Sequence, residues 1–218
     1  MKRNTDSAPG DTRQRILLES SRLFAQHGYY GTSTRDIAET VGIRQPSLFH
    51  HFAAKHAILA ELINLDVGST HDQVTRAHEF DADWADRLHF FMLSDNTIFL
   101  SQEFDAGGLY GPAVFVEPEL EDQRHAIFEL HRRTQELITS GITSGEFIDI
   151  DPEFVRRAST GISFEGMRER GAHPQVALTD RPLQIADFVL RSILQLPDRL
   201  PDIRRRSIEH LARTSPQG

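Results

Sequence analysis

The sequence contains no cysteine, which excludes a disulfide framework and zinc fingers built on cysteine ligands. It also has no run of about 18 apolar residues, the length that a transmembrane helix needs. The first residues are polar or basic and lead into a stretch with proline and glycine, without the apolar segment of a signal peptide. These absences predict a cytoplasmic protein without a disulfide framework, a signal peptide or a membrane-spanning segment.

Positive charge is scarce and unevenly placed. The 218 residues carry a formal net charge of −8, yet residues 1–67 contain 8 Lys and Arg against 7 Asp and Glu, and the rest contains 16 against 25. Hydrophobic residues make up 39% and charged residues 26%, as in ordinary globular proteins. Such asymmetry would orient the chain on a polyanion, although the small basic excess predicts modest non-specific affinity.

Residues 34–52 predict two short helices joined by a tight turn. Ser33 is a helix cap, with Asp36 three residues later as the reciprocal acid of a capping box. Gly42 supplies the left-handed residue that ends the first helix, and Pro46 suits the first turn of the second helix. The pattern is that of a helix-turn-helix, whose second helix enters the DNA major groove. Its inward residues are Ile37, Ala38, Val41, Leu48 and Phe52.

The stretch GYYGTSTRDIAETVGIRQPSLFHHFAAKHAIL, Gly28 to Leu59, resembles the DNA-binding domain of the TetR family of transcriptional regulators. The resemblance extends over about residues 11–71, roughly a third of the chain. It implies an all-α homodimer with a three-helix DNA-binding unit at the N-terminus and a larger helical domain that binds an effector. We therefore expect an arm over residues 1–10, a DNA-binding domain over 11–71 and an effector-binding and dimerisation domain over 72–214.

The same resemblance assigns roles to outward side chains of the motif. It implies phosphate contacts by Thr34 and Lys55 and base contacts by Arg35, Gln45 and Pro46. The chemistry agrees, because arginine suits guanine, glutamine suits adenine and proline can touch a thymine methyl group. Two positions depart from the family pattern. Phe49 stands where the family usually has a tyrosine, and Arg44 stands where a capping serine or threonine is common. The expected DNA-binding set is Thr34, Arg35, Arg44, Gln45, Pro46, Ser47, Phe49, His50, His51 and Lys55.

Helical periodicity continues through the rest of the chain. We expect helices over about residues 12–27, with Asp11 as cap and Gly28 as terminator, and over 55–70, 81–102, 151–170 and 182–196. A further helix starts near Pro118, and residues 103–117 are partly loop because of their glycines. Asp151-Pro152-Glu153 is a strong helix start, with a cap, a proline and an acid in sequence.

Aromatic residues interleaved with polar ones mark the expected site of a small apolar or aromatic effector. For each of these residues, plain core packing is the alternative to ligand contact. The expected ligand-binding set is His89, Phe91, Asn96, Phe99, Phe104, Tyr110, Phe115, Phe128 and His131.

The resemblance implies that the last two main helices form a four-helix bundle with their mates. The last of these helices is apolar around most of its circumference, which requires cover on several sides. The alternative is a core within one chain. The expected dimer interface comprises Phe154, Ala158, Ile162, Leu183, Ala186, Leu190, Ile193 and Leu194.

The eleven histidines do not form a metal-binding motif, and no nucleophile elbow or triad signature is present. We therefore predict no metal, no cofactor and no enzymatic activity. The prediction is a ligand-responsive, sequence-specific transcriptional regulator, more specifically a repressor released from a pseudo-palindromic operator. Two alternatives stay open: a DNA-binding regulator without an effector, and a helical enzyme or carrier that retains the motif.

Overall fold

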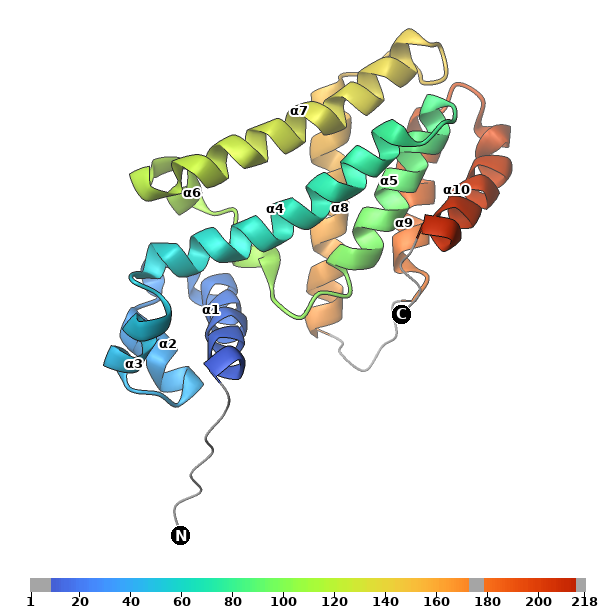
Figure 1. Cartoon of the computed structure of the whole chain (residues 1–218). Coiled ribbons are helices and arrows are strands. Elements are labelled where there is room, and N and C mark those ends of the chain that lie inside the picture. The colour runs from blue at the N-terminus through green and yellow to red at the C-terminus, as the bar shows by residue number, and fades with distance from the viewer. Residues whose placement is uncertain (1–8, 173–178, 215–218) are drawn as a thin grey trace. The chain divides into compact units, whose positions relative to one another are not determined.

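The computed structural model describes residues 9–172 and 179–214, and within them the chain is helical without a strand (Figure 1). This confirms the predicted all-α fold. The expected arm falls mostly on residues outside those described, as does most of the loop expected before residue 180. The helices are α1 Pro9–Gly31, α2 Thr34–Val41, α3 Gln45–His51, α4 Lys55–Glu79, α5 Trp84–Phe99, η1 Ala106–Gly108, α6 Pro112–Val116, η2 Pro118–Leu120, α7 Glu121–Thr143, α8 Pro152–Ala172, α9 Arg181–Ile193, η3 Pro197–Arg199 and α10 Leu200–Thr214.

The first compact unit contains the residues up to Asp66 together with Gln102–His125. Its core is made by the inward apolar residues of α1 to α4, among them Ile16, Phe24 and Leu62. Helix α1 begins at Pro9, so Asp11 lies inside it and is not its cap. Gly28 departs from helical geometry, with φ 73° and ψ 164°, where the sequence predicted the helix end, but a further turn carries α1 to Gly31.

Residues 102–125 pack against α1 and contact the middle of α4. The Asp105 amide donates to the Ser21 hydroxyl at 3.0 Å, and the Tyr110 hydroxyl donates to the carboxylate of Asp66. Burial raises the pKa of Asp66. By packing, this segment belongs to the first unit, whereas the sequence-based division placed it in the second domain. The assignment of functions to residues 11–71 and 72–214 stays a prediction.

The second unit contains Val67–Ser101 and the residues from Ala126 onward. Helices α5, α9 and α10 lie side by side in it (Figure 1). The buried carboxylate of Asp86 on α5 accepts two hydrogen bonds from the Arg206 guanidinium of α10, at 2.6 and 2.9 Å. Because Asp86 is only 1% exposed, this ion pair ties the terminal helix firmly to the core.

The start of α8 follows its sequence signal. The Asp151 carboxylate accepts from the Glu153 amide at 3.0 Å, and Pro152 is the first helical residue. Helix α9 ends at Ile193, earlier than expected, and the chain then passes through η3 into α10. Helix α4 is longer than expected and reaches Glu79, so it starts in the first unit and ends in the second.

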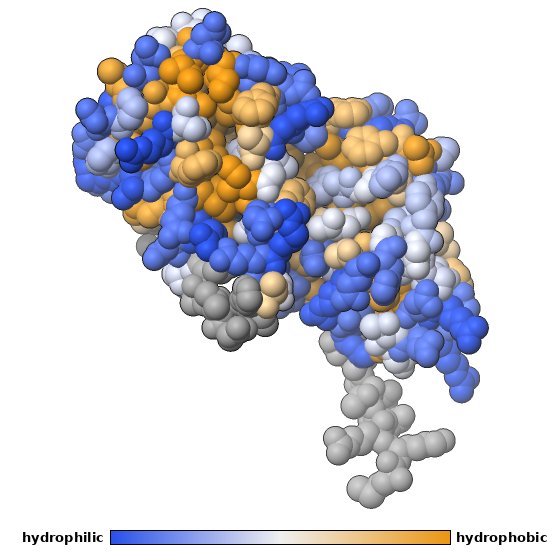
Figure 2. Space-filling view, turned by 180° about the vertical axis from the view of Figure 1, so that it is seen from behind, coloured by the Kyte–Doolittle hydropathy of each residue, from blue (hydrophilic) through white to orange (hydrophobic). Residues whose placement is uncertain are grey.

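Apolar surface gathers on the second unit in the face seen in Figure 2. On α8 and α9, the large apolar side chains left exposed are Phe154 and Phe188, at 62% and 64%. Helices α8 and α9 contact each other. A neighbouring pair of helices thus presents exposed phenylalanines that no part of the described chain covers.

Replacing Gly108 by alanine should destabilise the protein by about 1–3 kcal/mol, because the new methyl group would overlap the α1 backbone. A Cβ at this position would lie 2.3 Å from the carbonyl carbon of Phe24. Gly68→Ala is the matched control, since a Cβ there meets nothing within 4 Å and alanine favours a helix by about 0.5–1 kcal/mol. Urea unfolding measures both, and an unchanged midpoint for Gly108→Ala would contradict the close approach.

Candidate nucleic-acid interface

Helix α2 begins with the predicted capping box. The Ser33 hydroxyl accepts from the Asp36 amide at 3.1 Å, and the Ser33 amide donates to the Asp36 carboxylate at 2.8 Å. Hydrogen bonds from Ser33 lower the pKa of Asp36. Ile37, Ala38 and Val41 are buried, which turns the opposite face of α2 outward.

The turn between the two motif helices depends on Gly42. This residue has φ 76° and ψ 31°, and its amide donates to the carbonyls of Ala38 and Glu39. A left-handed conformation is disfavoured for residues with a Cβ, so glycine fits here. The predicted terminator of the first motif helix is therefore confirmed.

Helix α3 buries Leu48 and its following residue Phe52 while exposing its other side. Pro46 lies in its first turn, and Arg44 stands at the cap position without a side-chain capping bond, as expected from the sequence. Phe49 is 46% exposed, so part of its ring lies on the outward side of α3. Of the other outward residues, Gln45, Pro46 and His50 are exposed and Ser47 and His51 are half-buried.

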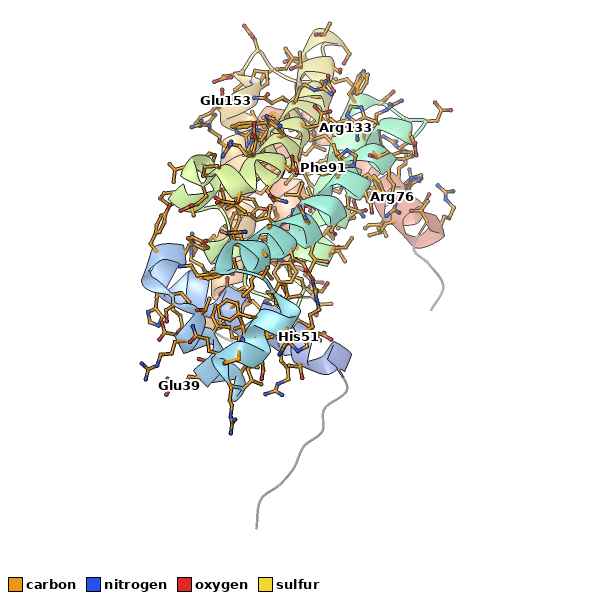
Figure 3. The ribbon with its side chains drawn as sticks, turned by 60° about the vertical axis from the view of Figure 1, so that its left-hand side comes forward. Glu39, His51, Arg76, Phe91, Arg133 and Glu153 are labelled. Atoms are coloured by element: carbon orange, nitrogen blue, oxygen red, sulfur yellow. The ribbon has the colours of Figure 1, made fainter. Side chains whose placement is uncertain are left out.

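An open concavity separates the outward faces of α2 and α3. Its lining comprises Arg35, Ala38, Glu39, Ile43, Arg44 and Gln45. The Gln45 amide nitrogen donates to the Thr34 hydroxyl at 2.8 Å, which links α3 to α2 and orients the glutamine. Figure 3 labels Glu39 and His51 among the helices of the first unit. The structure thus brings the predicted Arg35, Arg44 and Gln45 together around one hollow.

Glu39 is the lining residue that the sequence interpretation missed. It lies four residues after Arg35, one helical turn along the same outward face, so helical spacing would have found it. A carboxylate in such a position can accept a hydrogen bond from the exocyclic amine of cytosine. The hollow is therefore lined by the cations of Arg35 and Arg44, the amide of Gln45 and the carboxylate acceptor of Glu39.

Lys55 is placed differently from its expected role. Its ammonium group donates to the carbonyls of Tyr29 and Thr32, at 2.6 and 2.7 Å, and lies 4.0 Å from the centre of the Tyr29 ring. Burial lowers its pKa. The group holds the end of α1 to the start of α4, so most of its donor capacity is used inside the unit. A phosphate contact by Lys55 remains only a prediction.

The residues expected to bind an effector do not form one group. Phe104, Tyr110 and Phe115 belong to the first unit, and the other six belong to the second. Phe115 and Phe128 are each 51% exposed, whereas His89, Phe91, Asn96 and Phe99 are buried and His131 is half-buried. Figure 3 shows Phe91 among the helices of the second unit. A role of any of these residues in ligand contact stays a prediction.

His89 takes part in a polar network within the second unit. Its Nε2 lies 3.0 Å from a carboxylate oxygen of Asp187, which also pairs with Arg204. Although burial opposes ionisation, hydrogen bonds from His89 and Arg204 leave the pKa of Asp187 below its usual range. This arrangement ties α5, α9 and α10 together and gives His89 a structural role.

The residues expected at a dimer interface divide into two sets. Ala186, Leu190, Ile193 and Leu194 are all at most 4% exposed within one chain, because α9 packs on α5 and α10. For these four, the core within one chain was the better interpretation. Phe154 and Ala158 are exposed, and Ile162 and Leu183 are half-buried, so the outer faces of α8 and α9 stay available.

Among the described residues, no three His, Cys, Asp or Glu side chains gather in a way that could hold a metal ion. In the same part of the chain, none of the helices has the length and apolarity required to cross a membrane.

This geometry defines a DNA-binding unit of the helix-turn-helix class, with buried apolar faces and polar groups turned outward around one hollow. The family model described as "Bacterial regulatory proteins, tetR family" matches residues 16–62. Residues 16–62 thus form a DNA-binding domain of the TetR family of transcriptional regulators, as the sequence motif predicted.

Two relatives illustrate the extent of the sequence similarity. The repressor KstR2 of Mycolicibacterium smegmatis is 37% identical over 60 residues, which cover 28% of this chain and 29% of the relative. The repressor AcnR of Corynebacterium diphtheriae is 43% identical over 54 residues, covering 25% and 28%. The chain thus spans less than a third of the length of these relatives, and the sequence similarity is concentrated in the DNA-binding unit.

Similarity in fold extends much further. The crystal structure of Mycobacterium smegmatis AmtR matches with a TM-score of 0.77 and 26% identity, covering 97% of this chain and 98% of that one. KstR2 of Mycobacterium tuberculosis matches in fold with a TM-score of 0.72 and 22% identity, over 84% and 95%. These relatives and neighbours are regulators of transcription and not enzymes, in agreement with the sequence-based expectation.

Lys55→Met should lower the free energy of unfolding by about 1–3 kcal/mol, because two carbonyl groups lose a charged donor while the apolar stem is retained. Urea unfolding measures the change. Arg44→Met is the control, because this exposed side chain makes no capping bond. The free energy of unfolding of this variant should stay within about 0.5 kcal/mol of that of the unsubstituted protein. Equal stability of Lys55→Met and the unsubstituted protein would show that the ammonium group is free for an external anion.

Proposed function

We propose that this chain is a transcriptional repressor that binds a pseudo-palindromic operator as a homodimer and is released by a small-molecule effector in the cytoplasm. The observation that carries the proposal is the concavity between α2 and α3. Burial of the apolar faces of both helices leaves Arg35, Arg44 and Gln45 around it, outside the core and accessible to a partner. These are side chains that read base edges in the major groove.

Each lining residue has a matching group on DNA. Arg35 can form a bidentate pair with guanine, and Gln45 with adenine. The bond from Gln45 to Thr34 restricts the glutamine side chain before DNA arrives, which reduces the entropy lost on binding. Phe49 and Pro46 add apolar surface that suits thymine methyl groups.

A symmetric pair of chains explains the exposed phenylalanines of α8 and α9. Phe154 and Phe188 are too exposed for the interior of a single chain, and a two-fold interface would bury both in each protomer. Such a dimer would place two copies of α3 roughly 34–36 Å apart, one turn of B-DNA. The operator would then contain two half-sites related by the same symmetry.

Release by an effector requires a ligand that binds the DNA-free conformation better than the DNA-bound one. The buried aromatic and polar residues of the second unit are the candidates for this binding. A regulator without an effector is the competing possibility. A thermal-shift screen against amphipathic and aromatic metabolites separates the two, because a solid core would be stabilised by none of them.

Selection of bound DNA from a random pool tests the central claim. The purified full chain should recover sites that share two inverted half-sites, with centres about 10 base pairs apart or a multiple of that spacing. Recovery of DNA without a common sequence at low salt would argue against specific readout. Failure to retain any duplex would remove the DNA-binding function altogether.

Gln45→Ala should cost about 1–3 kcal/mol in affinity for the selected operator and relax the base preference at one position in each half-site. Gln26→Ala is the matched control, because Gln26 is an exposed glutamine on α1 away from the concavity. Fluorescence anisotropy on operator and random DNA measures both variants. An equal loss on the two DNAs would exclude base readout by Gln45.

Phe188→Glu should convert the dimer to a monomer, because it introduces a like charge facing its symmetry mate in an apolar interface. Operator affinity should fall by at least about tenfold, since one chain engages only one half-site. Phe128→Glu on α7 changes a phenylalanine of similar exposure outside α8 and α9 and serves as control. Light scattering gives the mass of each variant; a Phe188→Glu dimer would place the interface elsewhere.

A further inference from the structure

A side-chain hydrogen bond joins the first residues of the two motif helices. Thr34 is the first residue of α2, and Gln45 is the first residue of α3. The Gln45 Nε2 donates to the Thr34 hydroxyl at 2.8 Å. Gln45 is exposed and lines the hollow, whereas Thr34 is half-buried. The bond therefore anchors an exposed side chain to a position that the fold of the first unit fixes.

The Thr34 hydroxyl acts as an acceptor in this bond. Thr40, on the same helix, donates its hydroxyl to the Asp36 carbonyl at 2.9 Å, which is a common bond for a threonine inside a helix. Among the described residues, the Thr34 hydroxyl makes no such donor bond. A hydroxyl has one donor hydrogen and two acceptor lone pairs. Thr34 can therefore hold the glutamine and still donate to another acceptor, such as a phosphate oxygen.

The same bond determines which groups Gln45 can present to a base. A glutamine amide has two N–H donors and one carbonyl acceptor. Because one N–H is used by Thr34, the free edge of the amide consists of one N–H beside the carbonyl oxygen. Adenine shows the complementary pair in the major groove, the acceptor N7 beside the N6 amine donor. The anchored amide is thus arranged for adenine before DNA arrives.

Guanine fits the anchored amide poorly. Its major-groove edge shows two neighbouring acceptors, N7 and O6. An unanchored glutamine can turn its amino group toward both of them. The anchored amide keeps its carbonyl oxygen on that side, so two acceptors would face each other without a hydrogen between them. Such an unsatisfied pair is costly where binding expels water, and it would act against the wrong base.

We propose that Thr34 is a positioning residue that makes Gln45 select adenine over guanine, by holding the amide with one N–H and the carbonyl toward the base. This inference rests on the proposed DNA-binding function. It is distinct from a phosphate contact by Thr34, because a phosphate contact favours every sequence alike, whereas the orientation of an amide favours one base. The first residue of α2 therefore contributes to the base preference of α3.

The test compares two duplexes that differ at a single base pair. The operator recovered by selection is synthesised with A·T and with G·C at the position where Gln45→Ala relaxes the base preference. Fluorescence anisotropy with the full chain gives the ratio of the two dissociation constants. The unsubstituted protein should favour A·T by at least about tenfold. Thr34→Val keeps the shape of the side chain without the hydroxyl and should reduce the ratio to about threefold or less.

Controls separate positioning from other effects of Thr34. Thr34→Ser retains a hydroxyl and should keep the ratio within about twofold of the unsubstituted value. Thr34→Ala is a second variant without the hydroxyl and should reduce the ratio as Thr34→Val does. Thr40→Val removes an exposed hydroxyl from the same helix, away from Gln45, and should leave the ratio unchanged. A lost phosphate contact weakens both duplexes alike and cancels in the ratio.

An unchanged ratio in both Thr34→Val and Thr34→Ala would overturn the positioning role and leave the DNA-binding function intact. An equal reduction in Thr40→Val would do the same, because it would indicate a general effect of α2. A selected operator without a preference for A·T at the Gln45 position would exclude selection of adenine. If selection recovers no common sequence, the proposed function and this inference fail together, so the selection step distinguishes the two failures.

Discussion

Burial of the apolar faces of α2 and α3 is the constraint on which the recognition surface depends. Once Ile37, Val41 and Leu48 are inside the first unit, helical geometry leaves Arg35 and Gln45 no position but the outside. The capping box and the left-handed Gly42 then fix where each helix starts and stops. The polar surface is thus a consequence of core packing, because the burial of the inward residues fixes the positions of the outward side chains on the same helix.

The sequence predicted those features whose partners lie a few residues apart. The contacts of Ser33 with Asp36 and of Gly42 with Ala38 are local, so spacing alone identified them. The family resemblance assigned Lys55 to phosphate, and the sequence could not reveal its actual partners, because Tyr29 and Thr32 are 26 and 23 residues away and their carbonyls carry no sequence signal. Burial patterns in α9 were ambiguous for a related reason. An apolar stripe shows that a face is covered, but it does not show whether the cover comes from the same chain.

The second unit pairs its buried carboxylates with basic side chains from other helices. Asp86 is buried and fully paired by Arg206, and Asp187 is shared between His89 and Arg204. Such satisfied pairs hold the helices together, whereas removing one partner of a pair would leave a buried charge without compensation.

The use of Lys55 inside the first unit affects how this protein would find its operator. With Lys55 occupied by carbonyls and a nearly balanced charge over residues 1–67, the described residues of this unit offer few free cations to a phosphate backbone. Weak attachment to random DNA shortens each episode of sliding along the duplex and returns the protein quickly to solution. The search would then proceed mainly by repeated three-dimensional encounters, and a larger fraction of the molecules would be unbound at any moment.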